Sequence, residues 1–108
     1  MDCIFCKIIA GEVPAQKTYE DENVLSFLDA HPKAPGHTLV VPKEHYRWFY
    51  DLPDDLSAAL FVAAKKVARA LKEEHCADYV RLSAVGVDVP HVHLHLLPQH
   101  LNTNETEV

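Results

Sequence analysis

Three histidines alternate with apolar residues near the end of the chain, in the segment His91-Val92-His93-Leu94-His95-Leu96-Leu97. Successive side chains of a β-strand point to opposite faces, so His91, His93 and His95 are expected to share one face. Imidazole is mostly neutral near pH 7 and can act as a nucleophile, a base or a metal ligand. The row therefore predicts a catalytic cluster, with a metal site or a chance cluster on a solvated face as alternatives. One ion cannot bind all three rings, because the outer two would lie about 14 Å apart along a strand.

Two cysteines at the start of the chain, Cys3 and Cys6, have the Cys-x-x-Cys spacing of metal sites and of redox sites. No βαβ pattern surrounds them, which does not favour a thioredoxin-like role. A tetrahedral zinc site would need two further ligands from elsewhere in the chain. The alternative is a pair of buried free thiols that pack as small apolar groups. Cys76 has no neighbouring cysteine, and we expect it to be a packing residue.

The elements that must position these residues can be read from apolar periodicity and from turn residues. Residues 54–75 carry apolar side chains at steps of three and four, which predicts a long amphipathic helix. A short helical segment is expected within residues 1–10, ended by Gly11. The β-prone runs are residues 24–28, 38–41, 79–85 and 91–97. The connections before the long helix are too short for parallel crossovers, so we expect an α+β fold with a largely antiparallel sheet. The apolar face of the histidine strand would pack under the helix.

Length and composition describe an ordinary globular domain. The chain has 108 residues, of which 48% are hydrophobic and 24% charged, enough for one core and too few for two. No apolar run approaches the ~20 residues that span a membrane, and the first residues do not resemble a signal peptide. We therefore expect a cytoplasmic protein that does not bind membranes. The net charge of −6 opposes nucleic-acid binding.

The histidine row resembles the histidine triad (HIT) motif, in which three histidines alternate with apolar residues, and every position matches. The resemblance extends in the right order over residues 4–14, 19–21, 27–29 and 35–45. It implies a single HIT domain over residues 1–108, with 102–108 as a loose tail. It also implies a five-stranded antiparallel sheet with one long helix and a short N-terminal helix. The sheet would continue across a homodimer.

The resemblance implies a nucleotide phosphoramidase or hydrolase that acts at the α-phosphate of a purine nucleoside phosphoramidate or dinucleotide. His93 would be the nucleophile and would form a nucleotidyl-histidine intermediate that water then cleaves. The second ring nitrogen needs an acceptor, and we expect a backbone carbonyl there. His95 would donate to the α-phosphate oxygens. His91 and His37 would complete the cluster, although His37 could also be a turn residue after Pro35-Gly36.

The resemblance also implies a nucleoside pocket and a metal site. Asp29 would accept hydrogen bonds from the two ribose hydroxyls, with a strand-end turn residue as the alternative. The pocket for the base would be lined by apolar residues that could equally belong to the hydrophobic core alone. Those residues are Phe5, Ile8, Phe27 and Leu39. A structural zinc ion would be held by four side chains, and no organic cofactor is expected. The four zinc ligands would be Cys3, Cys6, His45 and His91.

The chain departs from the family just before the histidine row. Many relatives carry a glycine-glutamine-serine-like stretch there, whereas this chain reads Val85-Gly86-Val87-Asp88-Val89-Pro90. Asp88 could point away, act as a protonated general acid, or favour a cationic amine as leaving group. We place Asp88 among the catalytic candidates, on the leaving-group side. Two other hypotheses stay open: a purine-nucleotide-binding module with little or no turnover, and a zinc-binding scaffold. The aromatic run 46–50 is assigned to core or an interface, not to substrate.

Overall fold

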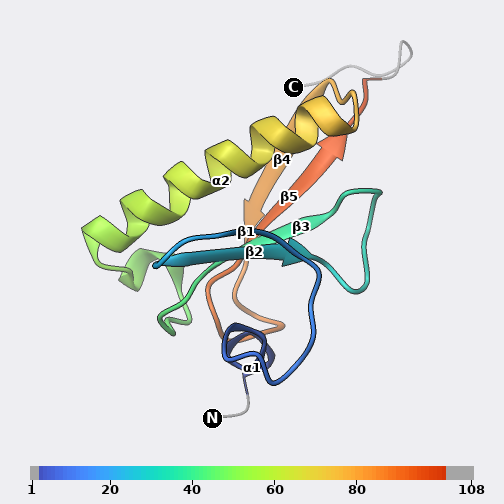
Figure 1. Cartoon of the computed structure of the whole chain (residues 1–108). Coiled ribbons are helices and arrows are strands. Elements are labelled where there is room, and N and C mark those ends of the chain that lie inside the picture. The colour runs from blue at the N-terminus through green and yellow to red at the C-terminus, as the bar shows by residue number, and fades with distance from the viewer. Residues whose placement is uncertain (1–2, 102–108) are drawn as a thin grey trace.

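Residues 3–101 of the computed structural model form a five-stranded antiparallel sheet with a helix on each side (Figure 1). The strand order across the sheet is β1-β2-β3-β5-β4. No helix within these residues is long and apolar enough to cross a membrane. In chain order the elements are α1 (Ile4–Ile9), β1 (Lys17–Glu20), β2 (Val24–Leu28), β3 (Thr38–Pro42), the 3₁₀ helix η1 (Phe49–Asp51), α2 (Asp54–Glu74), β4 (Tyr79–Ala84) and β5 (Leu94–Gln99).

The long helix α2 covers one face of the sheet. Its buried residues recur at helical spacing, and Leu60 at the centre of the stripe has no exposed surface. This stripe packs against Val40 of β3 and against Leu94 and Leu96 of β5. Burial of each such side chain contributes about 1.5–3 kcal/mol. The apolar face of the histidine segment therefore lies under the helix, as its alternation predicts.

The short helix α1 packs on the opposite face of the sheet. Phe5 and Ile8 form a second apolar cluster with alternate residues of β2 and β3, among them Phe27 and Leu39. The helix begins at Ile4 and is capped by Cys3, whose Sγ accepts the backbone N–H of Cys6 at 3.4 Å. It ends at Ile9, and Gly11 follows with a positive φ of 81°, a conformation that costs glycine little. Because α1 and the histidines lie on the same side, this face contains the candidate site.

Most of the predicted elements are confirmed, and two predictions are wrong. The strand predicted at 91–97 begins at Leu94 and ends at Gln99, so Pro98 does not end it. The carbonyl of Gln99 accepts from the Asp78 amide on the β4 side. Because the backbone groups of successive strand residues point to alternate sides, the Pro98 nitrogen points towards the β3 side. On that side β3 pairs only with residues 94–96. A proline there removes no ladder hydrogen bond. Cys76 is exposed after α2 rather than packed. The expected loose tail, 102–108, lies outside the described residues.

Candidate active site

His93 lies just before β5, buried against the edge of the Phe5 ring, with ring centroids 5.0 Å apart. Its Nδ1 lies 2.7 Å from the backbone carbonyl of His91. A carbonyl can only accept a hydrogen bond, so Nδ1 carries the proton and donates. In the neutral ring the lone pair is then on Nε2. The expected backbone acceptor is thus present, and it leaves a nucleophilic nitrogen on the far side of the ring.

His37 and His95 form a second imidazole pair, 2.9 Å apart between Nε2 of His37 and Nδ1 of His95. The backbone N–H of Lys33 donates to Nδ1 of His37 at 3.1 Å. Because that nitrogen accepts, the proton of neutral His37 is on Nε2 and is donated to His95. His95 then accepts at Nδ1 and carries its own proton on Nε2. One backbone amide therefore places the His37 proton on the nitrogen that faces His95, and His95 takes this tautomer when His37 donates to it.

Both rings of this pair are held uncharged. Burial, together with the neighbouring His93 and His37 rings, lowers the pKa of His95 to about 4. Burial also lowers the pKa of His37, against the opposing charge of Asp29. At neutral pH His95 is therefore a neutral N–H donor rather than an imidazolium.

A cavity of about 910 Å³ opens in front of His93 and His95, within the range of small-molecule sites. All of the residues predicted to bind the nucleoside line it: Phe5, Ile8, Phe27, Asp29 and Leu39. The apolar members also belong to the cluster beneath α1, so they serve as core and as cavity wall at once. A position in the hydrophobic core therefore does not exclude a position in the cavity wall.

Asp29 follows β2, where it is part of a turn and also lines the cavity. Its Oδ1 accepts the backbone N–H of His31 at 2.9 Å, as a turn residue does. Its Oδ2 lies 3.4 Å from Nε2 of His37, and the residue lines the cavity. One carboxylate oxygen is therefore engaged by the turn, while the other faces the histidines.

Asp88 is exposed and lines the same cavity as His93 and His95. The loop that carries it is held by a close approach at Gly86. A Cβ at Gly86 would lie 2.9 Å from the carbonyl oxygen of Arg47 and 3.0 Å from the Trp48 ring. The Nε–H of Arg47 also donates to the carbonyl of Gly86 at 3.3 Å. Glycine is therefore required at position 86 for this packing.

A smaller cavity of about 220 Å³ also borders His93. Its walls include Trp48 and Tyr50 after β3 and Val85 and Val87 after β4. The sequence predicts a core or interface role for the aromatic run 46–50 and no part in the site. The signal that could have indicated one is the run of aromatic residues directly after His45.

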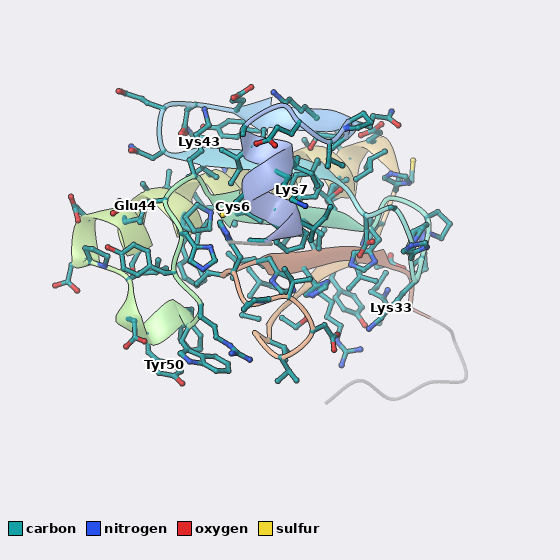
Figure 2. All side chains as sticks on the ribbon, turned by 90° about the horizontal axis from the view of Figure 1, so that it is seen from below. Cys6, Lys7, Lys33, Lys43, Glu44 and Tyr50 are labelled. Carbon is teal, nitrogen blue, oxygen red and sulfur yellow. The ribbon has the colours of Figure 1, made fainter. Side chains whose placement is uncertain are left out.

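The four residues expected to bind zinc converge between α1, the segment after β3 and the segment before β5. The Nδ1 atoms of His45 and His91 are 3.1 Å apart, and each lies 3.2–3.5 Å from a cysteine Sγ. A tetrahedral zinc ion requires about 3.3 Å between nitrogens and about 3.6 Å between nitrogen and sulfur. The Nε2 of His91 donates to the carbonyl of Pro42 at 2.8 Å, which leaves Nδ1 free to ligate. Figure 2 shows Cys6 on the side of α1 nearer to Glu44, the residue before His45.

A second group of possible ligands, Asp29, His37 and His95, fits a metal poorly. The atom of His37 that would ligate is Nε2. Because Nδ1 of the same ring accepts the Lys33 amide, Nε2 carries the proton and has no lone pair for a metal. The hydrogen bonds therefore favour a metal ion at the cysteine-histidine cluster and a proton network at this one.

Comparison with known proteins gives a match to the HIT domain family over residues 10–102. The chain is 45% identical to an uncharacterized HIT-like protein of Methanocaldococcus jannaschii, over 95% of the chain and 83% of the relative. It is 39% identical to adenosine 5'-monophosphoramidase hnt1 of Schizosaccharomyces pombe, over 92% of the chain and 75% of the relative. It is 36% identical to adenylylsulfatase HINT3 of Arabidopsis thaliana, over 91% of the chain and 52% of the relative.

Solved structures agree with the fold. A HIT-family protein from Bacillus subtilis superposes with a TM-score of 0.88 at 42% identity, over 93% of this chain and 74% of that one. A zinc-bound histidine triad protein from Mycobacterium smegmatis also gives a TM-score of 0.88, at 36% identity, over 96% of this chain and 79% of that one.

Proposed function

The chain belongs to the HIT domain family, and we propose that it is a nucleotide hydrolase that cleaves purine nucleoside phosphoramidates at the α-phosphate. The observation that carries the proposal is the orientation of His93. Its Nδ1–H is held by a backbone carbonyl, and the ring lines a nucleotide-sized cavity. A relative named adenosine 5'-monophosphoramidase supports the same reaction.

In the proposed reaction, Nε2 of His93 attacks the α-phosphorus of the substrate. The bond from phosphorus to the leaving nitrogen breaks, and the departing amine takes up a proton from solvent. A water molecule then attacks the same phosphorus, gives a proton back to solvent and breaks the bond from phosphorus to His93, which releases the nucleoside monophosphate. The Nε2–H of His95 donates to an α-phosphate oxygen, where negative charge builds in both transition states. His95 does this as a neutral ring, which agrees with its lowered pKa.

The nucleoside would occupy the larger cavity. Phe5, Ile8, Phe27 and Leu39 offer an apolar wall to the base. The carboxylate of Asp29 suits the ribose because it can accept from two adjacent hydroxyls. These residues provide shape and apolar contact, so we propose a purine nucleoside as the ligand without a preference between adenine and guanine.

The leaving group would extend from His93 towards Asp88 and the smaller aromatic cavity. Two charges 4 Å apart repel by about 4 kcal/mol at an effective dielectric of 20, and by about 1 kcal/mol in water. A carboxylate at this position therefore disfavours an anionic leaving group relative to an amine. The charge of Asp88 thus favours a phosphoramidate over an adenylyl sulfate, the substrate suggested by the name of another relative.

Zinc is proposed as a structural ion held by Cys3, Cys6, His45 and His91. The donor set and its spacing fit a closed tetrahedral site, and a zinc-bound relative of similar fold supports the assignment. The ion would link α1 to the segment after β3, which carries His45, and to the segment before β5, which carries His91. No step of the reaction passes through it. His91 would contribute to catalysis through its backbone carbonyl, which orients His93.

A homodimer is proposed through β4, one of the two edge strands of the sheet. Leu82 on this strand is 46% exposed, and Val85 directly after it is 55% exposed. An exposed edge with apolar side chains is a template for pairing with another strand. A second copy paired there would continue the sheet and enlarge the buried core of a small domain.

The alternative function is a purine-nucleotide-binding module that turns over little substrate. Asp88 favours this alternative. Its carboxylate lines the larger cavity together with His93 and His95, and it would oppose the build-up of negative charge on the phosphate in the transition state. Nucleotide binding and hydrolysis must therefore be measured separately.

The test is hydrolysis of adenosine 5'-phosphoramidate by the wild type, His93→Ala and His100→Ala. His100 is exposed and lies outside the site, so its variant is a matched control. The wild type and the control should release adenosine monophosphate, and His93→Ala should not. Mass spectrometry of rapidly quenched wild type should show one added nucleotidyl group on the peptide that contains His93. Binding of adenosine monophosphate without turnover by the wild type would select the nucleotide-binding module, and unchanged activity of His93→Ala would refute the assigned nucleophile.

A further inference from the structure

The candidate ribose ligand and the candidate phosphate donor are connected through one residue, His37. Its Nε2 is 2.9 Å from Nδ1 of His95 and 3.4 Å from Oδ2 of Asp29. The side chain of His37 is only 1% exposed, so bulk water does not compete for these contacts. The part of the site that would recognise the sugar is therefore in direct contact with the part that would hold the phosphate.

His37 has a single ring proton to share between these two neighbours. The backbone amide of Lys33 donates to Nδ1 at 3.1 Å, and a backbone N–H can never accept. The proton of the neutral ring is therefore on Nε2, which faces both acceptors. Figure 2 shows Lys33 far from Glu44, on the other side of α1. The network is thus separate from the proposed zinc cluster.

Asp29 competes with His95 for that proton when no ribose is bound. Its Oδ1 is engaged by the His31 amide, which leaves Oδ2 as the oxygen that faces His37. A carboxylate is a stronger acceptor than a neutral ring nitrogen. If the Nε2–H of His37 turns towards Asp29, Nδ1 of His95 loses its donor, and nothing in the pair then specifies which nitrogen of His95 is protonated.

We propose that a ribose diol bound to Asp29 commits the His37 proton to His95, and so fixes the tautomer in which His95 donates to the α-phosphate. Hydroxyl donors would occupy Oδ2 and weaken its attraction for the His37 N–H. Asp29 is then a positioning residue for His95 as well as a ribose ligand. This inference rests on the proposed function, because it requires a nucleotide in the cavity.

The consequence is that the diol contributes to turnover and not only to binding. A hydroxyl that contacts only Asp29 in both ground and transition states would change KM and leave kcat unaltered. A diol that organises His95 also strengthens a contact made in the transition state. Loss of one neutral hydrogen bond of this kind predicts a fall in kcat of about tenfold.

The kinetic test compares adenosine 5'-phosphoramidate with its 2',3'-dideoxy analogue on the wild type and on His37→Ala. In the wild type the analogue should show a higher KM and a kcat about tenfold lower. In His37→Ala the loss of the diol should change KM alone, because the connection to His95 is gone. A wild-type kcat that does not depend on the diol would overturn the inference. So would a fall in kcat of equal size in both proteins.

A spectroscopic test does not depend on activity or on a variant that folds. The ¹⁵N shifts of the His95 ring are recorded for the wild type alone, with adenosine and with 2',3'-dideoxyadenosine. Adenosine should place the His95 proton on Nε2, and saturating dideoxyadenosine should leave a mixture of tautomers. Identical His95 spectra in the two complexes would refute the coupling while leaving the proposed function intact. If neither nucleoside binds and the phosphoramidate is not hydrolysed, the proposed function fails as well.

Discussion

Loss of the proposed zinc ligand Cys6 should lower the thermal stability of the chain by a predictable amount. The four candidate ligand atoms lie within 4.8 Å of one another, and they join segments that are up to 88 residues apart in sequence. An ion bound only by the folded state stabilises it by about 2.7 kcal/mol when its free concentration is 100 times the dissociation constant. For 108 residues the entropy of unfolding is about 0.23 kcal/mol per kelvin, so the ion raises Tm by about 12 °C.

The assay measures zinc content and Tm for the wild type, Cys6→Ser and Cys76→Ser. Cys76 is exposed and is not part of the cluster, so its variant controls for the loss of a thiol. The wild type and Cys76→Ser should each contain one zinc ion per chain and lose about 12 °C of Tm on chelation. Cys6→Ser should contain little zinc and should not respond to the chelator.

Catalysis should be less sensitive to zinc than stability is. The His91 ring is held by its hydrogen bond to the carbonyl of Pro42, the His91 carbonyl accepts from His93, and neither contact passes through the proposed ion. Well below its Tm, zinc-free protein should therefore retain kcat within about tenfold, the value of one oriented hydrogen bond. Equal zinc content in the wild type and Cys6→Ser, or a Tm that ignores the chelator, would refute the structural-zinc reasoning. Complete loss of kcat at a temperature where the apo protein is folded would refute the purely structural role.

Three further measurements address the leaving group, the acid stability and the assembly. Asp88→Ser should raise kcat/KM about fivefold for an anionic leaving group such as that of adenylyl sulfate, because an exposed carboxylate repels it by about 1 kcal/mol; unchanged kinetics on amine and anionic leaving groups alike would remove Asp88 from the site. Stability should fall as the pH drops from about 6.5 to about 4, because the unfolded chain binds a proton at His95 near its ordinary pKa, whereas in the fold that pKa is lowered to about 4. Urea midpoints of zinc-free protein check this, and a decline of equal size in His95→Asn would contradict it. Leu82→Glu should convert a dimer to a monomer in sedimentation, because it places a charge on the exposed face of β4; a wild type that sediments as a monomer would exclude the proposed assembly.

Local patterns were sufficient for most of the elements. The helix α2 and the two faces of the histidine segment follow from apolar spacing. The position of a residue in the helical or strand repeat decides which face it is on, and the apolar face is the one that becomes buried. The edge strand β1 was implied only by the family resemblance. Its residues Lys17–Glu20 are mostly exposed and carry no apolar alternation. The end of β5 depended on where β3 stops beside Pro98, which no local pattern contains.

For the candidate site too, some features follow from the sequence and others only from the fold. The sequence by itself determined that imidazoles, thiols and a carboxylate are available, and its alternation placed the histidines opposite α2. Only the tertiary structure decided how these groups are paired. The His91 carbonyl orients His93, and the Lys33 amide places the proton of His37 on the nitrogen that faces His95. These hydrogen bonds join loops and strands up to 58 residues apart. Their directions depend on backbone positions that the folded sheet alone brings together, and for this reason the tautomers could not be read from the sequence.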